Sequence, residues 1–406
     1  MTTVSKPARV SQQNLYYHEI EEFIEELRNE LCFGFVWILI ENNDEEDRIH
    51  VDVPDIEKLL ICDDYLRNNS NFIPRRALLY VPGDDVRKIS KIKEFNVDCL
   101  VLDCEDGVAV NKKAKAREEI SAFLSNGFGN GKSEIAVRLN SIESGMFEED
   151  LRSIVCNKYP TTIVLPKLNS PDEAEFFTES LKKHVSRDNL NAPINLIFIS
   201  ESCQSILSLP RICESLVGLS KSSGIFELAA IIFGSDDFCA SLGATRTKTS
   251  LEILYARQRL VLVAKAYGLQ AIDMVDIDDG NLSSTVRHVN IMFKFNAVED
   301  VQCFQASNED LIGLKTSSEV AASFGYTGKQ IIHPSQIEIV QQAFLPSKDK
   351  LLWALQLLEE FAKFQSEGKG VFVFRNQMID MPTVRQAKNI VNGMKKIEKT
   401  GNKTKQ

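Results

Sequence analysis

Cys99-Leu-Val-Leu-Asp-Cys-Glu-Asp106 is the stretch of sequence that decides the fold, because an unbroken apolar run stops there at a group of acids. Continuous rather than alternating hydrophobicity is typical of a strand covered on both faces, as in a parallel sheet with helices outside it. Seven further runs have the same form, at residues 76–82, 135–140, 162–167, 195–201, 231–237, 271–276 and 330–334. Eight such strands predict an α/β protein with a closed (β/α)8 TIM barrel.

The segments between these strands have apolar residues recurring at three and four positions, which predicts helices packed on the barrel wall. We therefore expect the barrel to occupy residues 72–345, with an insertion at about 280–309 to which no role can be assigned. Two further helical patterns, at 348–365 and 381–399, surround a glycine-containing break and predict a C-terminal helical arm over 346–406.

Composition bounds the function of the chain. Its 406 residues are 44% hydrophobic and 26% charged, as in ordinary globular proteins. The longest apolar candidate, residues 31–40, is half the ~20 residues of a membrane span, so we expect no membrane partner. A net charge of -10 argues against a nucleic-acid partner, since phosphate binding needs clustered Lys and Arg. The nine cysteines contain no CxxC pair, so the sequence does not indicate a structural zinc site.

Residues 1–71 differ from the rest and form an N-terminal extension. The first 17 residues contain Lys6 and Arg9 but no acid, which resembles an organelle transit peptide, whereas residues 18–27 form an acidic amphipathic pattern. A targeting segment and a disordered or accessory segment both remain open.

The barrel places the carboxyl ends of all its strands at one mouth. Polar residues that end the predicted strands should therefore converge there: Asp103, Glu105, Asp106, Arg138, Lys167, Glu201 and Asp237. Glu201 and Asp237 end neighbouring strands and suit Mg²⁺, which prefers oxygen ligands, although each could instead cap a helix. Arg138 could hold a substrate carboxylate and stabilise an enolate oxygen, or neutralise the buried acids. For Lys167, a salt bridge at the barrel rim is the preferred interpretation.

Several ordered motifs resemble the citrate lyase beta subunit family, within the metal-dependent aldolase superfamily. They are Leu79-Tyr-Val-Pro-Gly83, Leu102-Asp-Cys-Glu-Asp-Gly-Val108, Val137-Arg-Leu-Asn140, Leu165-Pro-Lys167, Phe233-Gly-Ser-Asp-Asp237 and Ile332-His-Pro334. Stretches such as Phe324-Gly-Tyr-Thr-Gly-Lys-Gln330 and Met378-Ile-Asp-Met-Pro382 are similar to the members that act in animal mitochondria. The resemblance covers about residues 72–400, except for the insertion.

The resemblance implies a set of roles at the mouth. Glu201 and Asp237 would bind Mg²⁺, Arg138 would contact the substrate, and Asp103, Glu105 and Asp106 would orient metal-bound water. Coenzyme A would be recognised by Tyr80, Arg87 and Lys91, of which the last two share one helix face. A solvated basic face is the alternative for that pair. Gln330 and Ile331 match further substrate contacts.

Asp380 is the residue outside the barrel to which the resemblance gives most weight. It matches a catalytic acid that a C-terminal arm delivers to the active site of an adjoining subunit, and the family implies a homotrimer. A helix N-cap is the alternative, because Asp380 stands two residues before Pro382. The family also implies a mitochondrial location, with the cytoplasm as the alternative.

The implied activity is Mg²⁺-assisted cleavage of an acyl-CoA thioester, citramalyl-CoA, to acetyl-CoA and pyruvate, with malyl-CoA lyase or malate synthase side activity. A base would remove the proton of the tertiary hydroxyl while the metal polarises the emerging keto acid. Three positions depart from the family pattern, namely Asn169, Ser205 and Cys239, where Glu, Gly and Arg are expected. They leave a second hypothesis, an inactive family member that serves as an acyl-CoA-binding or scaffold protein.

Overall fold

The structure is a computed structural model that describes residues 36–40, 47–51, 73–126, 133–156, 158–247, 249–276, 308–366 and 371–403. Most of the expected N-terminal extension, and the expected insertion as far as residue 307, lie outside these residues. The described chain divides into two units. One is Ile73–Phe344, and the other contains Leu345–Asn402 with the antiparallel strands β1 (Val36–Ile40) and β2 (Asp47–Val51).

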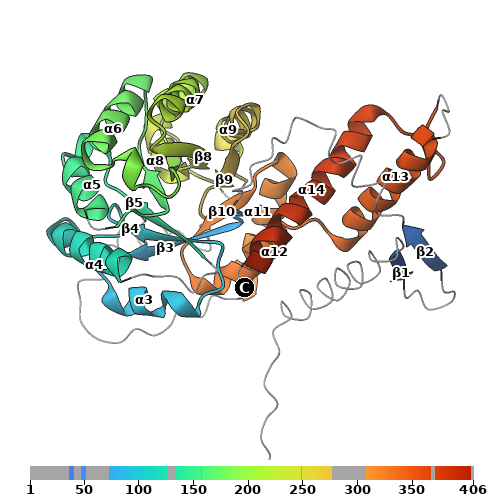
Figure 1. Cartoon of the computed structure of the whole chain (residues 1–406), viewed down its shortest axis with the longest axis horizontal. Coiled ribbons are helices and arrows are strands. Elements are labelled where there is room, and N and C mark those ends of the chain that lie inside the picture. Colours follow the sequence, from blue (N-terminus) through green and yellow to red (C-terminus); the bar gives the residue numbers. More distant parts are fainter. Residues whose placement is uncertain are drawn as a thin grey trace, which may run out of the picture. The chain divides into compact units, whose positions relative to one another are not determined.

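Eight parallel strands close into a barrel in the order β10-β3-β4-β5-β6-β7-β8-β9, which confirms the predicted TIM-barrel class (Figure 1). The strands are β3 (Ala77–Pro82), β4 (Cys99–Asp103), β5 (Glu134–Arg138), β6 (Thr162–Leu165), β7 (Ile194–Ser200), β8 (Phe226–Phe233), β9 (Gln270–Asp273) and β10 (Gly328–Ile331). The last strand closes the barrel against the first, where Lys329 donates its amide N–H to the carbonyl of Arg76 at 2.9 Å.

Two apolar layers explain why the strands are hydrophobic without alternation. Side chains that point inward, such as Val101, Val164 and Ile232, fill the barrel interior. Their neighbours along the same strands, such as Leu100 and Ile231, point outward and pack against the helices. Because alternate residues are buried on opposite faces, every position of these strands favours an apolar side chain.

Helices surround the strands on the outside (Figure 1). They are α3 (Val86–Lys91), α4 (Lys113–Ser125), α5 (Phe147–Val155), α6 (Pro171–His184), α7 (Cys203–Ser223), α8 (Ser235–Leu242), α9 (Leu254–Ala266), α11 (Asn308–Phe324) and α12 (Ile337–Ala343). Helix α7 continues through Pro210, which cannot donate a hydrogen bond to the carbonyl of Ile206. Arg259 of α9 supplies the missing donor, with its Nε 2.8 Å from that oxygen.

The C-terminal unit is built from two helices and a short hairpin. Helix α13 (Lys348–Ser366) precedes strands β11 (Val373–Phe374) and β12 (Gln377–Met378), and helix α14 (Met381–Lys403) follows them. Phe361, Phe372 and Phe374 form the centre of its own apolar core. Both predicted helices of the arm are therefore present, and a short hairpin lies between them.

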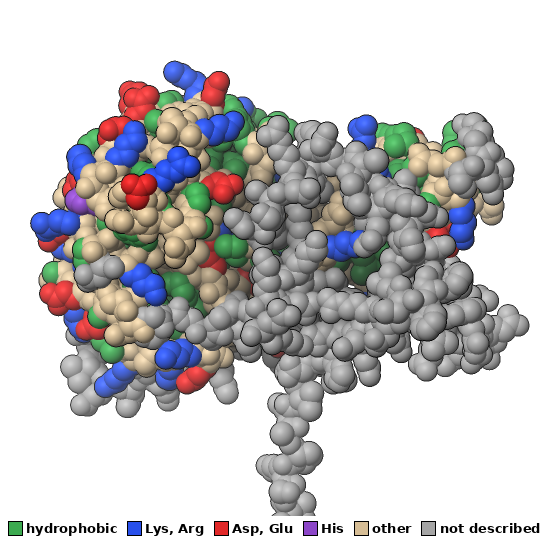
Figure 2. Space-filling view, viewed as in Figure 1, with side chains coloured by type: hydrophobic (Ala, Val, Ile, Leu, Met, Phe, Trp, Pro, Cys, Tyr) green, Lys and Arg blue, Asp and Glu red, His purple; other side chains and the backbone are tan. Residues whose placement is uncertain are grey.

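The described helices and the face of the molecule shown in Figure 2 bear on the expected partners. None of the described helices combines the length and the apolar character needed to span a bilayer. On the face shown in Figure 2, acidic and basic side chains are interspersed over the barrel helices.

Candidate active site

Arg138 forms the centre of the ionic cluster at the barrel mouth. As the last residue of β5, it donates from Nε and Nη2 to the two carboxylate oxygens of Asp103 at 2.7 and 2.6 Å. Its third nitrogen, Nη1, lies 2.8 Å from Oε2 of Glu105. The guanidinium also stacks 4.8 Å from the ring centroid of Tyr80. Pairing with both acids agrees with the counter-ion interpretation, and it leaves a substrate role as a prediction.

Glu201 and Asp237 lie on neighbouring elements at the same mouth, and Lys167 joins them. The backbone N–H of Lys167 donates to Oε1 of Glu201 at 2.7 Å, and its ammonium is 3.3 Å from Oδ2 of Asp237. The same ammonium donates to Oε1 of Glu105 at 3.0 Å and lies 3.9 Å from Asp106. The structure therefore brings these residues together at the barrel mouth, as predicted.

Asp237 does not end a strand as expected. Strand β8 stops at Phe233, and Gly234 caps helix α8, so Asp237 lies in the first turn of that helix. Neither carboxylate of the pair is an N-cap, because Gly234 caps α8 and Ser202 caps α7. A side chain at position 234 would approach Oε2 of Glu201 to 2.5 Å, so glycine leaves room for this carboxylate.

The mouth carries a surplus of negative charge, since five carboxylates (Asp103, Glu105, Asp106, Glu201 and Asp237) outnumber the three cations Arg138, Lys167 and Lys113. Burial raises the pKa of Glu201 well above its usual range, and the carboxylates of Glu105 and Asp237 raise it further. Burial, together with Asp106, raises the pKa of Glu105 to about 6 against the opposing charge of Arg138.

A divalent cation fits this donor set. No group of three His, Cys, Asp or Glu side chains in the described residues is arranged to hold a metal, and the predicted pair Glu201 and Asp237 would supply two ligands. Two hard oxygen ligands with open positions are what Mg²⁺ uses when it keeps several waters. A cation there would also offset the local excess of carboxylates.

Of the predicted substrate contacts in β3 and β10, the side chains of Tyr80 and Gln330 meet, whereas that of Ile331 points away from them. Tyr80 lies in β3, and its hydroxyl donates to Oε1 of Gln330 at 2.9 Å. Gln330 in turn donates to the carbonyl of Phe233 at 3.1 Å. Ile331 points the other way, since its side chain belongs to the core between strands and helices. Only the backbone of Ile331 remains to face a ligand at the mouth.

Arg87 and Lys91 lie four residues apart on the short helix α3, and both are exposed. Between them, Lys88 pairs with Asp85 at 3.5 Å. Asp85 also caps the helix by accepting from the N–H groups of Arg87 and Lys88. This arrangement is compatible with both predicted interpretations, a phosphate contact and a solvated basic face.

Asp380 belongs to the C-terminal unit, where it precedes helix α14. Its Oδ1 accepts hydrogen bonds from the backbone N–H of Thr383 at 3.0 Å and from the Thr383 hydroxyl at 2.6 Å. These bonds, the hydroxyl first, lower the pKa of Asp380, whose side chain is exposed. Capping is therefore present in the structure, as one of the two predicted roles.

Sequence reasoning missed two supports of the acid cluster. Lys113, in the first turn of α4, is buried and donates at 2.7 Å to the carbonyls of Cys104 and Glu105 and to Oδ1 of Asn140. Lys167 was assigned to a simple rim salt bridge, whereas its backbone also contacts Glu201. The position of Lys113, a few residues after the run of acids at 103–106, is the sequence signal that could have indicated it.

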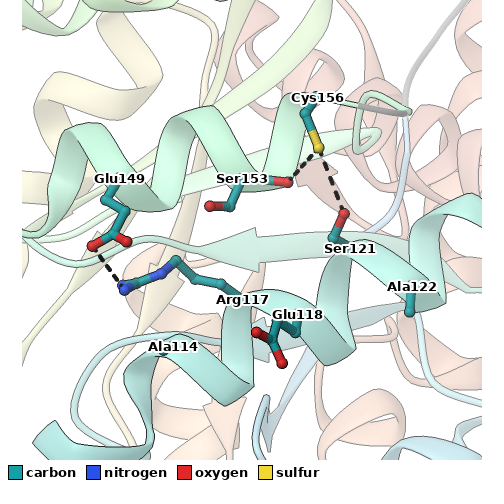
Figure 3. Close-up of a pocket in the computed structure, with 8 residues that line it drawn as sticks. All are labelled: Ala114, Arg117, Glu118, Ser121, Ala122, Glu149, Ser153 and Cys156. Carbon is teal, nitrogen blue, oxygen red and sulfur yellow. Dashed lines mark hydrogen bonds and ion pairs between the residues drawn. The ribbon is translucent and has the colours of Figure 1, made fainter.

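A groove on the outside of the barrel is separate from this chemistry (Figure 3). Helices α4 and α5 form it, and Arg117 reaches across to Oε2 of Glu149 at 2.8 Å. The groove is lined by Ala114, Arg117, Glu118, Ser121, Ala122, Glu149, Ser153 and Cys156. None of these is a strand residue, so the candidate active site remains the mouth.

A parallel barrel with paired carboxylates and an arginine at its mouth defines the class of TIM-barrel enzymes that stabilise charge on oxygen with a metal and a guanidinium. The sequence profile of the HpcH/HpaI aldolase/citrate lyase family matches residues 76–306, more than half of the chain. The chain belongs to this family.

Curated relatives agree with that assignment. The chain is 43% identical to human mitochondrial citramalyl-CoA lyase over 325 residues, which cover 80% of this chain and 86% of the relative. It is 27% identical to a citrate lyase subunit beta-like protein of Deinococcus radiodurans, over 78% of this chain and 96% of that protein.

Solved structures share the fold. CitE of Mycobacterium tuberculosis, in complex with magnesium, acetoacetate and coenzyme A, aligns with a TM-score of 0.56 and 24% identity, covering 79% of this chain and 98% of CitE. A citrate lyase of Burkholderia xenovorans aligns with a TM-score of 0.60 and 18% identity, covering 79% of this chain and 92% of that structure.

Proposed function

We propose that this protein is a Mg²⁺-dependent acyl-CoA lyase that cleaves citramalyl-CoA to acetyl-CoA and pyruvate, with malyl-CoA lyase or malate synthase side activity. The observation that carries the proposal is the meeting of Glu201 and Asp237 beside Arg138 at the barrel mouth. The name of the 43% identical human relative supports the substrate, and the magnesium and coenzyme A of CitE support the cofactor and the thioester.

The chain's own residues divide the work. Glu201 and Asp237 would hold Mg²⁺, which when bound polarises the keto-acid oxygen. Arg138, anchored by Asp103 and Glu105, presents a fixed cation to the oxygen on which negative charge accumulates when the carbon–carbon bond breaks. Because its anchors hold it before substrate arrives, little reorganisation is needed during the reaction.

Coenzyme A would approach the first strand of the barrel. Arg87 and Lys91 on α3 present two cations on one exposed helix face, a spacing suited to the phosphates of coenzyme A. Tyr80 and Gln330, which hydrogen-bond each other, would form the wall of the mouth on this side. A double substitution of Arg87 and Lys91 to Ala should raise KM for the thioester with little effect on kcat.

Asp380 would handle the proton gained or lost at the acetyl methyl carbon, and we infer that it acts in the mouth of a second copy. Its surroundings support insertion into a partner. Val373 and Met378 are cross-strand partners on the hairpin, 53% and 77% exposed, and Val371 and Met381 nearby are 59% and 48% exposed. These exposed apolar side chains would pack against the neighbouring subunit and bring Asp380 to its mouth, as in a homotrimer whose arms are exchanged between subunits.

Mixing variants tests this action in trans. Asp380→Asn and Glu201→Ala subunits, each nearly inactive alone, should regain part of the activity when co-assembled, because some mouths then combine an intact pair with an intact Asp380. Mixed oligomers without recovery would place Asp380 in its own subunit or outside the reaction. Sedimentation of the wild type measures the number of copies.

A coupled assay with citramalyl-CoA, malyl-CoA and citryl-CoA, with and without Mg²⁺, tests the function itself. Metal-dependent cleavage of any of the three separates an enzyme from a scaffold protein. Glu201→Ala or Asp237→Ala should abolish turnover and leave the barrel folded. The matched control is Glu179→Ala, which removes an exposed carboxylate paired with Lys182 on α6. Wild-type rates in either ligand variant would exclude the metal pair.

The location we propose is the mitochondrion, because the human, rat and mouse relatives are each named mitochondrial. Imaging of the full chain with a C-terminal tag tests this, and a cytoplasmic signal would contradict it.

A further inference from the structure

Lys167 has a backbone conformation that its residue type seldom adopts. Its φ is +52°, in the left-handed region that favours glycine. Residues held in such conformations persist only where the surrounding structure fixes them, and they gather at functional sites. Lys167 follows β6 at the barrel mouth, so the unusual backbone lies beside the candidate metal pair.

The left-handed turn lets one residue reach both carboxylates of the pair. Its N–H points at Oε1 of Glu201, 2.7 Å away, while its side chain extends to Oδ2 of Asp237 at 3.3 Å and Oε1 of Glu105 at 3.0 Å. The two contacts have different consequences. The neutral amide orients Glu201, whereas the ammonium places a positive charge on the oxygen of Asp237 that a metal would use.

Hydrogen bonds from the segment after Glu201 hold the turn in place. Asn169 donates from Nδ2 to the carbonyl of Lys167 at 3.0 Å, and its Oδ1 accepts from the hydroxyl of Ser202 at 2.5 Å. Ser205, fully buried, donates its hydroxyl to the carbonyl of Leu168 at 2.7 Å. The loop that carries Lys167 and the start of α7 are thus tied together.

We propose that Lys167 is a positioning residue that sets the divalent-cation affinity of the Glu201–Asp237 pair, with its amide fixing Glu201 and its ammonium competing with the cation for Asp237. The inference rests on the proposed function. A cation that binds Asp237 must displace the ammonium or bind beside it, and like charges a few ångströms apart repel strongly in a partly buried site. The chain thereby limits how tightly its own site binds metal.

Calorimetric titration of the full-length protein with Mn²⁺ and with Mg²⁺ tests the proposal. Lys167→Met keeps the backbone and the apolar stem but removes the charge, and it should bind either cation on the order of tenfold more tightly than the wild type. Lys167→Gly keeps the N–H and adopts the left-handed turn freely, so it should also bind more tightly. The test uses both variants so that it can still be read if one of them fails to fold.

The matched control is Lys183→Met, which removes a lysine paired with Glu148 at 3.4 Å in the last turn of α6 and should leave cation affinity unchanged. If Lys167 merely stabilised the fold, its variants would melt at lower temperature and bind cations equally or more weakly, which would overturn the inference. A wild-type protein that binds neither cation would overturn the metal site of the proposed function as well.

Discussion

Arg138→Lys is the substitution that best separates catalysis from charge compensation. The wild-type guanidinium makes three short contacts, two with Asp103 and one with Glu105, from a side chain that is 13% exposed. An ammonium keeps the charge but cannot present three donors in one plane. Losing about two charge-assisted bonds, at roughly 1.5–3 kcal/mol each and partly replaced by water, should lower the free energy of unfolding by about 2–4 kcal/mol.

The effect on turnover should exceed what this instability explains. Removing a donor aimed at a developing oxyanion costs about 10²–10³ in kcat, so we expect a loss of that order in a sample that is still folded. Urea unfolding with an unchanged m-value measures the stability, and the coupled lyase assay at saturating Mg²⁺ measures kcat and KM separately.

The control for Arg138→Lys is an arginine that pairs with the opposite end of the same strand. Arg75 donates from Nε and Nη2 to Glu134, the first residue of β5, at 2.6 Å each and is buried. Arg75→Lys should lose comparable stability, because the same planar pairing is broken, but it should keep kcat. If Arg138→Lys retained kcat within about threefold, like this control, Arg138 would be a structural counter-ion and the proposed role would be wrong.

Three further substitutions test the fold and the arm. Gly328→Ala should lower the free energy of unfolding by more than about 3 kcal/mol in urea unfolding, because a Cβ there would lie 1.8 Å from the carbonyl oxygen of Arg75; a neutral effect would contradict the strand closure. Burial raises the pKa of Asp273, but Lys329 and Arg257 together outweigh it and hold the folded-state pKa below its usual value. The stability advantage of wild type over Asp273→Asn should therefore be complete at pH 7 and shrink as the pH falls below about 4, and a constant difference would contradict the pairing. Met378→Ser, at a 77% exposed position, should change stability by less than about 0.5 kcal/mol but reduce turnover; equal turnover would argue against hairpin docking.

The fold was predictable because burial on both faces leaves a direct trace in the sequence. Every residue of β4 is buried, so its apolar run had one interpretation. The ends of the strands were harder to predict from the sequence where a helix follows a strand without a polar spacer. In 231–237 the strand stops at Phe233, and Asp237 is already helical, because Gly234 caps α8. The residues that follow the predicted strands therefore lie together as predicted, although Asp237 was assigned to the wrong element, and their roles stay a prediction.

Contacts that depend on the direction of the backbone could not be predicted from the sequence. The amide of Lys167 donates to Glu201 from a residue with a positive φ, and no local pattern predicts that conformation for a lysine. In β10, side chains alternate between faces, so Gln330 meets Tyr80 inside the barrel while Ile331 packs outside. A motif match cannot distinguish a side-chain contact from a backbone contact, and the strand geometry does.

The departures from the family pattern weigh less against activity than their number suggests, because two of them belong to one hydrogen-bonded network that contains no candidate metal ligand. Asn169 and Ser205, which stand where Glu and Gly were expected, are joined through Ser202 in one hydrogen-bonded network, and Ser205 also contacts Ser200 at 2.8 Å. This network tightens the connection between the Lys167 turn and the segment after Glu201 and removes no ligand. Cys239 is the third departure, and it is buried in the apolar core. Because the network leaves the contact between the Lys167 turn and Glu201 in place, these departures are compatible with an active enzyme.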